Sequence, residues 1–198
     1  MTLFEYDKVV RETFPVFCGV DEAGRGPLAG DVYAAAVVFD DDVIIEGIND
    51  SKKLSEKKRE ALYDEIISKA RAYCIATASI EEIEEINILN AAMLAMKRAV
   101  DGLGMNLDCA LIDGNKSPAD LPCRAAPIVK GDATSQSIAA ASILAKVARD
   151  RYMKEIAIKY PQYEFQKHKG YGTKLHYEKI KEFGISDVHR PSFLKKMK

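Results

Sequence analysis

Apolar residues follow two spacings along this chain, and each spacing predicts a kind of element. Continuous apolar runs of strand length occupy residues 16–20, 32–39, 73–79, 108–112 and, more briefly, 128–129. Apolar residues at helical spacing predict helices over residues 56–70, 80–85, 90–100, 134–160 and 174–183. Two segments without either spacing, 115–127 with its three prolines and 162–173, are expected to be loops.

The order of these elements predicts an α/β fold. The first two strands are joined by a turn rich in glycine and proline at residues 24–30, which indicates an antiparallel hairpin. Later strands alternate with helices, which is typical of a mixed sheet with helices packed on it. A soft boundary near Tyr160 would separate a core, residues 1–160, from a C-terminal helical extension, residues 161–198, although both can belong to one domain.

Four acids stand where predicted strands end or a helix begins. Asp21 and Glu22 follow the first strand, Asp113 follows the strand 108–112, and Asp132 precedes the long helix. Each acid alone is more readily explained as a turn former or helix cap. As a set they would repel one another unless a cation neutralised them, and oxygen ligands favour Mg²⁺ or Mn²⁺ over zinc.

One geometric condition applies to the first two acids. Neighbouring residues of a regular strand point to opposite faces of the sheet. Asp21 and Glu22 can therefore share one site only if the strand ends or bends there, and Gly24 and Gly26 would allow such a bend.

The charge of the chain is unevenly distributed. The net charge is −1, yet residues 146–198 hold 14 Lys and Arg against 6 Asp and Glu. A basic C-terminal part suits contact with a phosphate backbone, although charge alone favours a merely solvated surface. Each short polar motif, taken alone, fits either a surface loop or a binding site. Gly24-Arg25-Gly26 and Lys52 could contact phosphate, and Tyr171 could stack on a base or sugar.

Several classes of protein are disfavoured. The four cysteines form no Cys-x-x-Cys pair and the three histidines share no ligand spacing, so a zinc site is not expected. No apolar run approaches the roughly 18 residues of a membrane span. The first eight residues include Glu5 and Asp7 and lack a signal-peptide core, so we expect a cytoplasmic protein.

Six blocks of sequence together resemble the ribonuclease HII family. They occur in the order of the family and cover nearly the whole chain. The stretch Arg25-Gly26-Pro27 favours this type over the related type HIII, which usually has an extra N-terminal domain. The blocks are residues 19–30, 50–54, 111–115, 130–132, 140–150 and 168–173.

The resemblance implies a ribonuclease-H-like fold with a mixed five-stranded sheet. It also implies two divalent ions, Mg²⁺ or Mn²⁺, held by the four acids. The Gly24-Arg25-Gly26 turn would sense the 2′-hydroxyl of a ribonucleotide, Lys52 would contact phosphate, and Tyr171 would stack on the neighbouring deoxyribose.

The function that these implications favour is metal-dependent endonuclease activity. The enzyme would hydrolyse the RNA-containing strand of RNA–DNA hybrids and cut 5′ of ribonucleotides embedded in duplex DNA, leaving 3′-hydroxyl and 5′-phosphate ends. A monomer is the default expectation. Two alternatives stay open: a phosphohydrolase for small phosphoesters, which would not need the basic C-terminal part, and a non-catalytic module that binds RNA–DNA duplexes.

Overall fold

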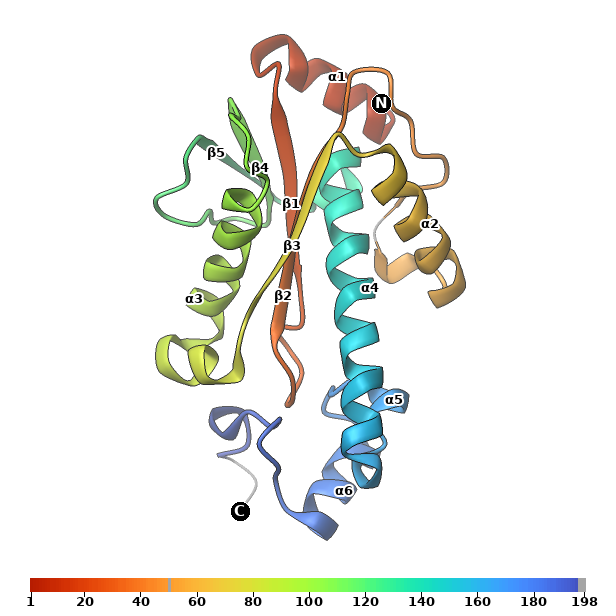
Figure 1. Cartoon of the computed structure of the whole chain (residues 1–198), viewed down its shortest axis with the longest axis vertical. Helices are drawn as coiled ribbons and strands as arrows, with labels where there is room; N and C mark the ends of the chain where they lie inside the picture. Colours follow the sequence, from red (N-terminus) through yellow and green to blue (C-terminus); the bar gives the residue numbers. More distant parts are fainter. Residues whose placement is uncertain (50, 196–198) are drawn as a thin grey trace.

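A mixed sheet of five strands runs through the middle of the protein, in the order β3-β2-β1-β4-β5 (Figure 1). The computed structural model describes residues 1–49 and 51–195. The central strand β1 pairs antiparallel with β2, as predicted, and parallel with β4. β3 extends the sheet beyond β2, and β5 extends it beyond β4. The strands are β1 (Phe17–Ala23), β2 (Val32–Val38), β3 (Ala72–Ala78), β4 (Cys109–Asp113) and β5 (Arg124–Ile128).

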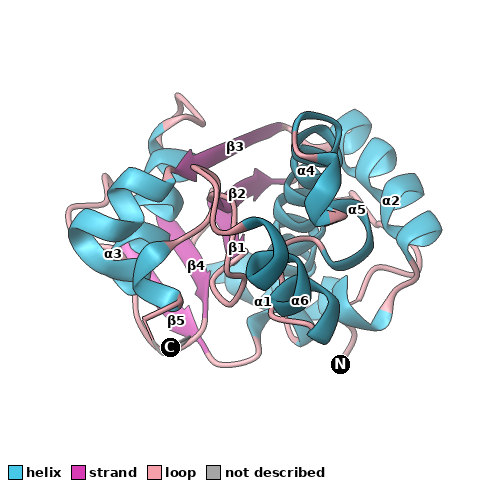
Figure 2. Cartoon of the chain, turned by 90° about the horizontal axis from the view of Figure 1, so that it is seen from below, coloured by secondary structure: helices cyan, strands magenta, loops and turns pink. Residues whose placement is uncertain are grey.

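Helices cover both faces of this sheet. α3 packs on one face, whereas α4 packs on the other with α1 and α2 beside it (Figures 1 and 2). The predicted mixed five-stranded sheet flanked by helices is thus confirmed. None of the helices in the described ranges combines the length and apolarity of a membrane span. The helices are α1 (Leu3–Thr13), α2 (Glu56–Lys69), α3 (Ile80–Asp101), α4 (Gln136–Lys159), α5 (Phe165–His168) and α6 (Lys174–Phe183), with short 3-10 turns η1 (Ser51–Lys53), η2 (Gly131–Ala133), η3 (Pro161–Tyr163) and η4 (Pro191–Phe193).

Small residues let α4 approach the central strand closely. A Cβ atom at Gly19 would lie 2.1 Å from the carbonyl carbon of Ser137, so no larger residue fits there. Ala139, Ala140 and Ala141 follow in the same part of α4 and are fully buried. The turn η2, which leads into α4, lies against the end of β4.

The N-terminal helix α1, which the apolar pattern did not predict, holds the start of α4. The buried carboxylate of Asp7 accepts hydrogen bonds from the backbone amide and the hydroxyl of Ser137, at 2.9 and 2.7 Å. Ser135 caps α4 through its own hydroxyl. The position of η2 is therefore fixed from both the sheet side and the α1 side.

Two other predictions differ from the structure. β5 (Arg124–Ile128) lies largely within the segment expected to be a loop, and it ends where the short strand 128–129 was expected to begin. Residues 80–85 and 90–100 belong to one helix, α3, which is interrupted at Asn87 with φ 68°. The side chain of Asn87 caps the second part, because its Oδ1 accepts from the amides of Leu89 and Asn90.

The chain beyond α4 brings the three histidines together. The rings of His168 and His176 are stacked with centroids 4.2 Å apart, and Nε2 of His176 lies 3.1 Å from Nε2 of His189. All three are buried against Tyr163 and Phe165, so they are packing residues. α4 ends at Lys159, close to the predicted end, and the division into residues 1–160 and 161–198 stays a prediction.

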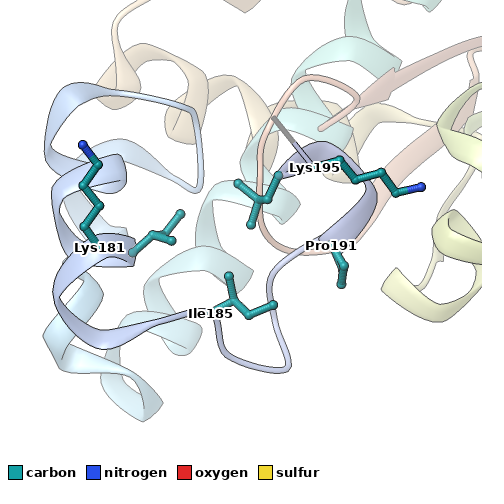
Figure 3. Close-up of a pocket in the computed structure, with 6 residues that line it drawn as sticks. Lys181, Ile185, Pro191 and Lys195 are labelled. Carbon is teal, nitrogen blue, oxygen red and sulfur yellow. The ribbon is translucent and has the colours of Figure 1, made fainter. Parts of the chain in front are cut away.

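An apolar groove crosses the surface of this C-terminal part (Figure 3). It has a volume of about 350 Å³ and contains neither a carboxylate nor a predicted site residue among the described residues that line it. The lining residues are Ile180, Lys181, Ile185, Pro191, Leu194 and Lys195. The candidate chemistry therefore lies elsewhere.

Candidate active site

Asp21 and Asp113 come from neighbouring parallel strands. In the register of β1 and β4, Gly19 pairs with Leu111 and Val20 with Ile112, which places Asp21 next to Asp113. Their side chains point to the α4 face, because Leu111 contacts Ile138 of α4 in the core, and alternation puts Asp113 on the same side. Two apolar strands that end at the same edge thus deliver two acids to one point.

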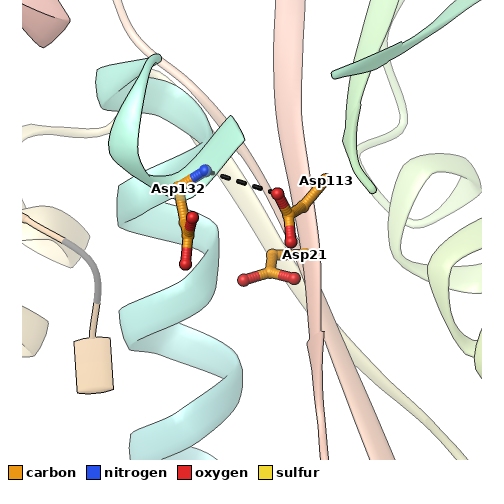
Figure 4. Close-up of side chains that lie close together, drawn as sticks. All are labelled: Asp21, Asp113 and Asp132. Atoms are coloured by element: carbon orange, nitrogen blue, oxygen red, sulfur yellow. Dashed lines mark hydrogen bonds between the residues drawn. The ribbon is translucent and has the colours of Figure 1, made fainter. Parts of the chain in front are cut away.

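Asp132 completes a group of three carboxylates (Figure 4). One oxygen from each of Asp21, Asp113 and Asp132 lies within 4.8 Å of the others. Oδ1 of Asp113 accepts hydrogen bonds from the amides of Gly131, at 2.7 Å, and Asp132, at 3.4 Å. These bonds tie the turn η2, and with it Asp132, to the end of β4.

The group is electrostatically strained without a cation. Burial raises the pKa of Asp21 well above its ordinary value, and the neighbouring charges of Glu22 and Asp113 raise it further. Asp21 is only 5% exposed. A hard divalent cation would neutralise this charge, and three carboxylate oxygens are the donor set that Mg²⁺ and Mn²⁺ prefer. The residues present therefore fit such an ion.

Glu22 is not a member of the group of three. β1 stays regular through Ala23 and pairs Glu22 with Ala34, which belongs to the core on the α3 face. Glu22 therefore points to the opposite face from Asp21, and the bend at Gly24 comes too late to reverse it. Its carboxylate lies 3.4 Å from the guanidinium of Arg25. Its role as a metal ligand stays a prediction.

All the predicted substrate-binding residues line one pocket beside the carboxylates. This pocket has a volume of about 210 Å³ and also contains Asp21 and Glu22. Its lining comes from the end of β1, from η1, from α4 and from the segment between α5 and α6. The residues are Asp21, Glu22, Ala23, Gly24, Arg25, Gly26, Ser51, Lys52, Ser142, Lys146 and Tyr171.

The pocket wall carries groups suited to a nucleic acid strand. The ring of Tyr171 is 42% exposed, and it lies under Nζ of Lys146, 5.7 Å from the ring centroid, and under the Arg149 guanidinium, at 5.8 Å. An exposed aromatic ring backed by cations can stack on a base or sugar. Ser51 and Ser142 share a hydrogen bond of 2.9 Å at the back of the pocket.

A second hollow adjoins the first on the α3 side. Glu22, Arg25 and Asp113 line it together with Met93 and Met96 of α3, and its volume is again about 210 Å³. Glu22 and Arg25 line both hollows. Asp21, Glu22 and Asp113 therefore line two adjoining hollows, one on each side of Glu22 and Arg25.

Comparison with known proteins decides the family. The family model described as Ribonuclease HII matches residues 18–196. The chain belongs to the ribonuclease HII family. It is therefore an endoribonuclease, a hydrolase of phosphodiester bonds.

Relatives in this family are similar over almost their whole length. The chain is 56% identical over 189 residues to the ribonuclease HII of Caldicellulosiruptor bescii, covering 96% of this chain and 91% of that protein. It is 59% identical over 178 residues to the ribonuclease HII of a Marinomonas species, covering 90% and 89%.

Solved structures are similar in fold. The ribonuclease H2 of Pyrococcus horikoshii superposes with a TM-score of 0.74 at 26% identity, covering 89% of this chain and 93% of that chain. A structure of the PCNA:RNase HII complex from Archaeoglobus fulgidus matches with a TM-score of 0.72 at 27% identity, covering 88% and 93%. The predicted ribonuclease-H-like architecture is thus confirmed.

Sequence reasoning missed two buried arginines next to the family's glycine-rich turn. Arg149 and Arg190 are both fully buried and donate to backbone carbonyls of residues 24–31. Nothing in the sequence marks them, because a guanidinium partnered by backbone carbonyls leaves no pattern of acidic residues. Lys146, which lies over Tyr171 and pairs with Asp150, was also not singled out by the sequence.

Proposed function

We propose that this enzyme hydrolyses the RNA-containing strand of RNA–DNA hybrids and cuts 5′ of ribonucleotides embedded in duplex DNA. The observation that carries the proposal is the approach of Asp21, Asp113 and Asp132 to within 4.8 Å, next to a pocket lined by the whole predicted substrate-binding set. Membership of the ribonuclease HII family supports the substrate class.

In this proposal Asp21, Asp113 and Asp132 hold divalent cations, with Glu22 as a fourth ligand at the edge facing α3. When bound, a pair of such ions lowers the pKa of the attacking water and neutralises charge that develops on the phosphate. The water oxygen forms the new P–O bond, the bond from phosphorus to the 3′-oxygen breaks, and that oxygen gains a proton. The products carry a 3′-hydroxyl and a 5′-phosphate.

The chain's own residues would bind and orient the strand. The turn Gly24-Arg25-Gly26 would sense the 2′-hydroxyl, which is the group that distinguishes RNA from DNA. Lys52 and Lys146, on the same pocket wall, would contact the phosphates. The exposed ring of Tyr171 would stack on the adjacent deoxyribose, so that an RNA-to-DNA junction is recognised.

The test is a cleavage assay with matched duplexes of one sequence: all DNA, DNA with one ribonucleotide, and a full RNA–DNA hybrid. We expect cleavage of the second and third with Mg²⁺ or Mn²⁺ and none with EDTA. Cleavage of the all-DNA duplex at the same rate, or ribonucleotide-dependent cutting in EDTA, would contradict the proposal. Turnover of a chromogenic phosphate ester without cleavage of either RNA-containing duplex would favour a phosphohydrolase instead.

We also propose that the enzyme acts in the cytoplasm as a monomer. The four cysteines are unpaired, which suits a reducing compartment. Gel filtration with light scattering should give a mass near 21.9 kDa. A mass twice as large, or recovery of the protein outside the cytoplasmic fraction, would count against this part of the proposal.

A further inference from the structure

The guanidinium of Arg190 is buried inside the turn that joins β1 to β2. Its hydrogen-bond acceptors are all backbone carbonyl oxygens of that turn. Nε donates to Gly30 at 2.8 Å, Nη2 to Gly24 at 2.7 Å, and Nη1 to Pro27 at 2.9 Å and Arg25 at 3.2 Å. One side chain thus connects the beginning of the turn to its end.

Backbone contacts reinforce this arrangement. The amide of Arg190 donates to the carbonyl of Leu28, the amide of Gly30 donates to the carbonyl of Val188, and Ala29 forms a β-bridge with His189. The C-terminal segment 188–190 therefore lies along the turn and pairs with it through an isolated β-bridge. Residues that are about 160 positions apart in sequence are joined at this point.

The turn needs such a partner because of its conformation. Gly24 has φ +103°, a conformation that residues with a side chain rarely adopt. A Cβ atom there would lie 2.2 Å from Nε of Arg149, so the space beside Gly24 is also filled. Carbonyls of the turn point inward, away from water, and a buried carbonyl without a donor is costly. The planar fork of arginine offers five N–H donors, whereas a lysine offers three from a single atom.

Other contacts of the turn connect it to the segment that carries Tyr171. The amide of Leu28 donates to the carbonyl of Gly170, next to Tyr171, and Arg149 donates from one guanidinium to the carbonyls of Ala29 and Lys169. Burial lowers the pKa of Arg190 to about 9, which still leaves it protonated at neutral pH. The turn and the aromatic ring are thus held at a fixed separation.

We infer that Arg190 is the positioning residue that sets the Gly24-Arg25-Gly26 turn against Tyr171, so that recognition of a ribonucleotide depends on a side chain that never touches the substrate. The inference rests on the proposed function of that turn. It assigns to the C-terminal segment 188–190 a role in specificity, separate from any role in holding metal.

The experiment compares wild type with Arg190→Lys and Arg190→Gln. Arg98→Lys is the control, because Arg98 also joins a backbone carbonyl, that of Thr77, to a second element, but lies away from the pocket lining. Affinity for two duplexes, all DNA and the same sequence with one ribonucleotide, is measured by fluorescence anisotropy in EDTA and well below each variant's melting temperature. Mn²⁺ binding is measured by calorimetry on the same samples.

We expect the ratio of the two affinities to fall about tenfold or more in Arg190→Lys, with affinity for the all-DNA duplex and Mn²⁺ binding unchanged. Arg190→Gln, which keeps only two N–H donors on a shorter side chain, should lose the preference at least as far. Amide hydrogen exchange at Gly24 and Gly26 should accelerate in both variants and not in Arg98→Lys.

Two results would overturn the inference. If Arg190→Lys had the same ratio of the two duplex affinities as the wild type, the turn would not need the guanidinium of Arg190. A parallel loss of both affinities and of Mn²⁺ binding would show a general structural role only. A wild type without preference for the ribonucleotide duplex would contradict the proposed function as well, so the two failures are distinguishable.

Discussion

Asp21 lies beside Asp113 on one face of the sheet because β1 and β4 pair in parallel, with Val20 opposite Ile112. Both strands are apolar up to these acids and end at the same edge. The strand order therefore brings together two acids that are 92 positions apart in the sequence. The turn η2 adds Asp132 to this pair.

Removal of one carboxylate of the group should abolish cleavage without abolishing binding of the duplex. For Asp113→Asn we expect kcat to fall by about 10³-fold or more, since the cations supply several kcal/mol of stabilisation to the transition state. Asp101→Asn, which changes an exposed acid paired with Lys97, is the control. Wild-type kcat in Asp113→Asn with Mg²⁺ present would refute the assignment.

Divalent ions should stabilise the folded protein through the same group. The pKa of Asp21 is raised because burial and two neighbouring carboxylates disfavour its charge, and a bound cation removes that penalty. Melting temperatures measured with and without Mn²⁺ should therefore differ for the wild type and not for Asp21→Asn. Without any ion, Asp21→Asn should be at least as stable as the wild type. An equal gain from Mn²⁺ in both proteins would place the ion elsewhere.

Tyr171 should act through its ring. Tyr171→Phe keeps a flat aromatic surface under Lys146 and Arg149 and should retain most activity at a single ribonucleotide. Tyr171→Ala should lose about 10-fold or more in kcat/KM, which corresponds to the 1–3 kcal/mol of one stacking contact. The measurement is steady-state cleavage of the duplex with one ribonucleotide. Unchanged activity in Tyr171→Ala would remove the stacking role.

The buried histidines should make stability depend on pH. Burial lowers the pKa of His176 and of His189 to about 4, from an ordinary value of 6.5. The unfolded chain takes up protons below about pH 6.5 while the folded protein does not, so the free energy of unfolding decreases as pH falls from about 6.5 towards 4. The expected loss between pH 7.5 and pH 5 is on the order of 2 kcal/mol for each of the two histidines.

Urea unfolding at about pH 7.5 and pH 5 measures this loss. Glu164 near His168 and Asp187 near His189 also titrate at acid pH, so the comparison is with His176→Phe under the same conditions. That variant should show a smaller drop between the two values. The same drop in both proteins would assign the pH dependence to carboxylates instead.

The sequence predicts the apolar parts of β1 and β4 but not their ends, because the acids expected to follow the strands belong to them. β1 continues through Glu22 to Ala23, and β4 includes Asp113. The sequence does not predict β5, since Arg124 and Pro127 are atypical of a strand and are tolerated only at the sheet edge. It also gives no indication of α1, whose apolar face is narrow and whose one buried residue is the acid Asp7.

The site was predictable in composition and less so in geometry. Three of the four acids meet, and Glu22 does not join them because β1 remains regular to Ala23. The alternation of side chains along a strand indicated that Glu22 could face away from Asp21. The position of the bend could not be derived from the sequence. The roles of Arg149 and Arg190 depend on carbonyl groups of a distant turn, and only the three-dimensional structure reveals such partners.

The most direct test of the metal site is anomalous diffraction from crystals soaked in Mn²⁺. We expect a peak bounded by oxygens of Asp21, Asp113 and Asp132, and its absence in Asp113→Asn. We expect a second peak on the side of Glu22. No peak between these carboxylates, in crystals of a protein that cleaves with Mn²⁺ in solution, would contradict the proposed metal site.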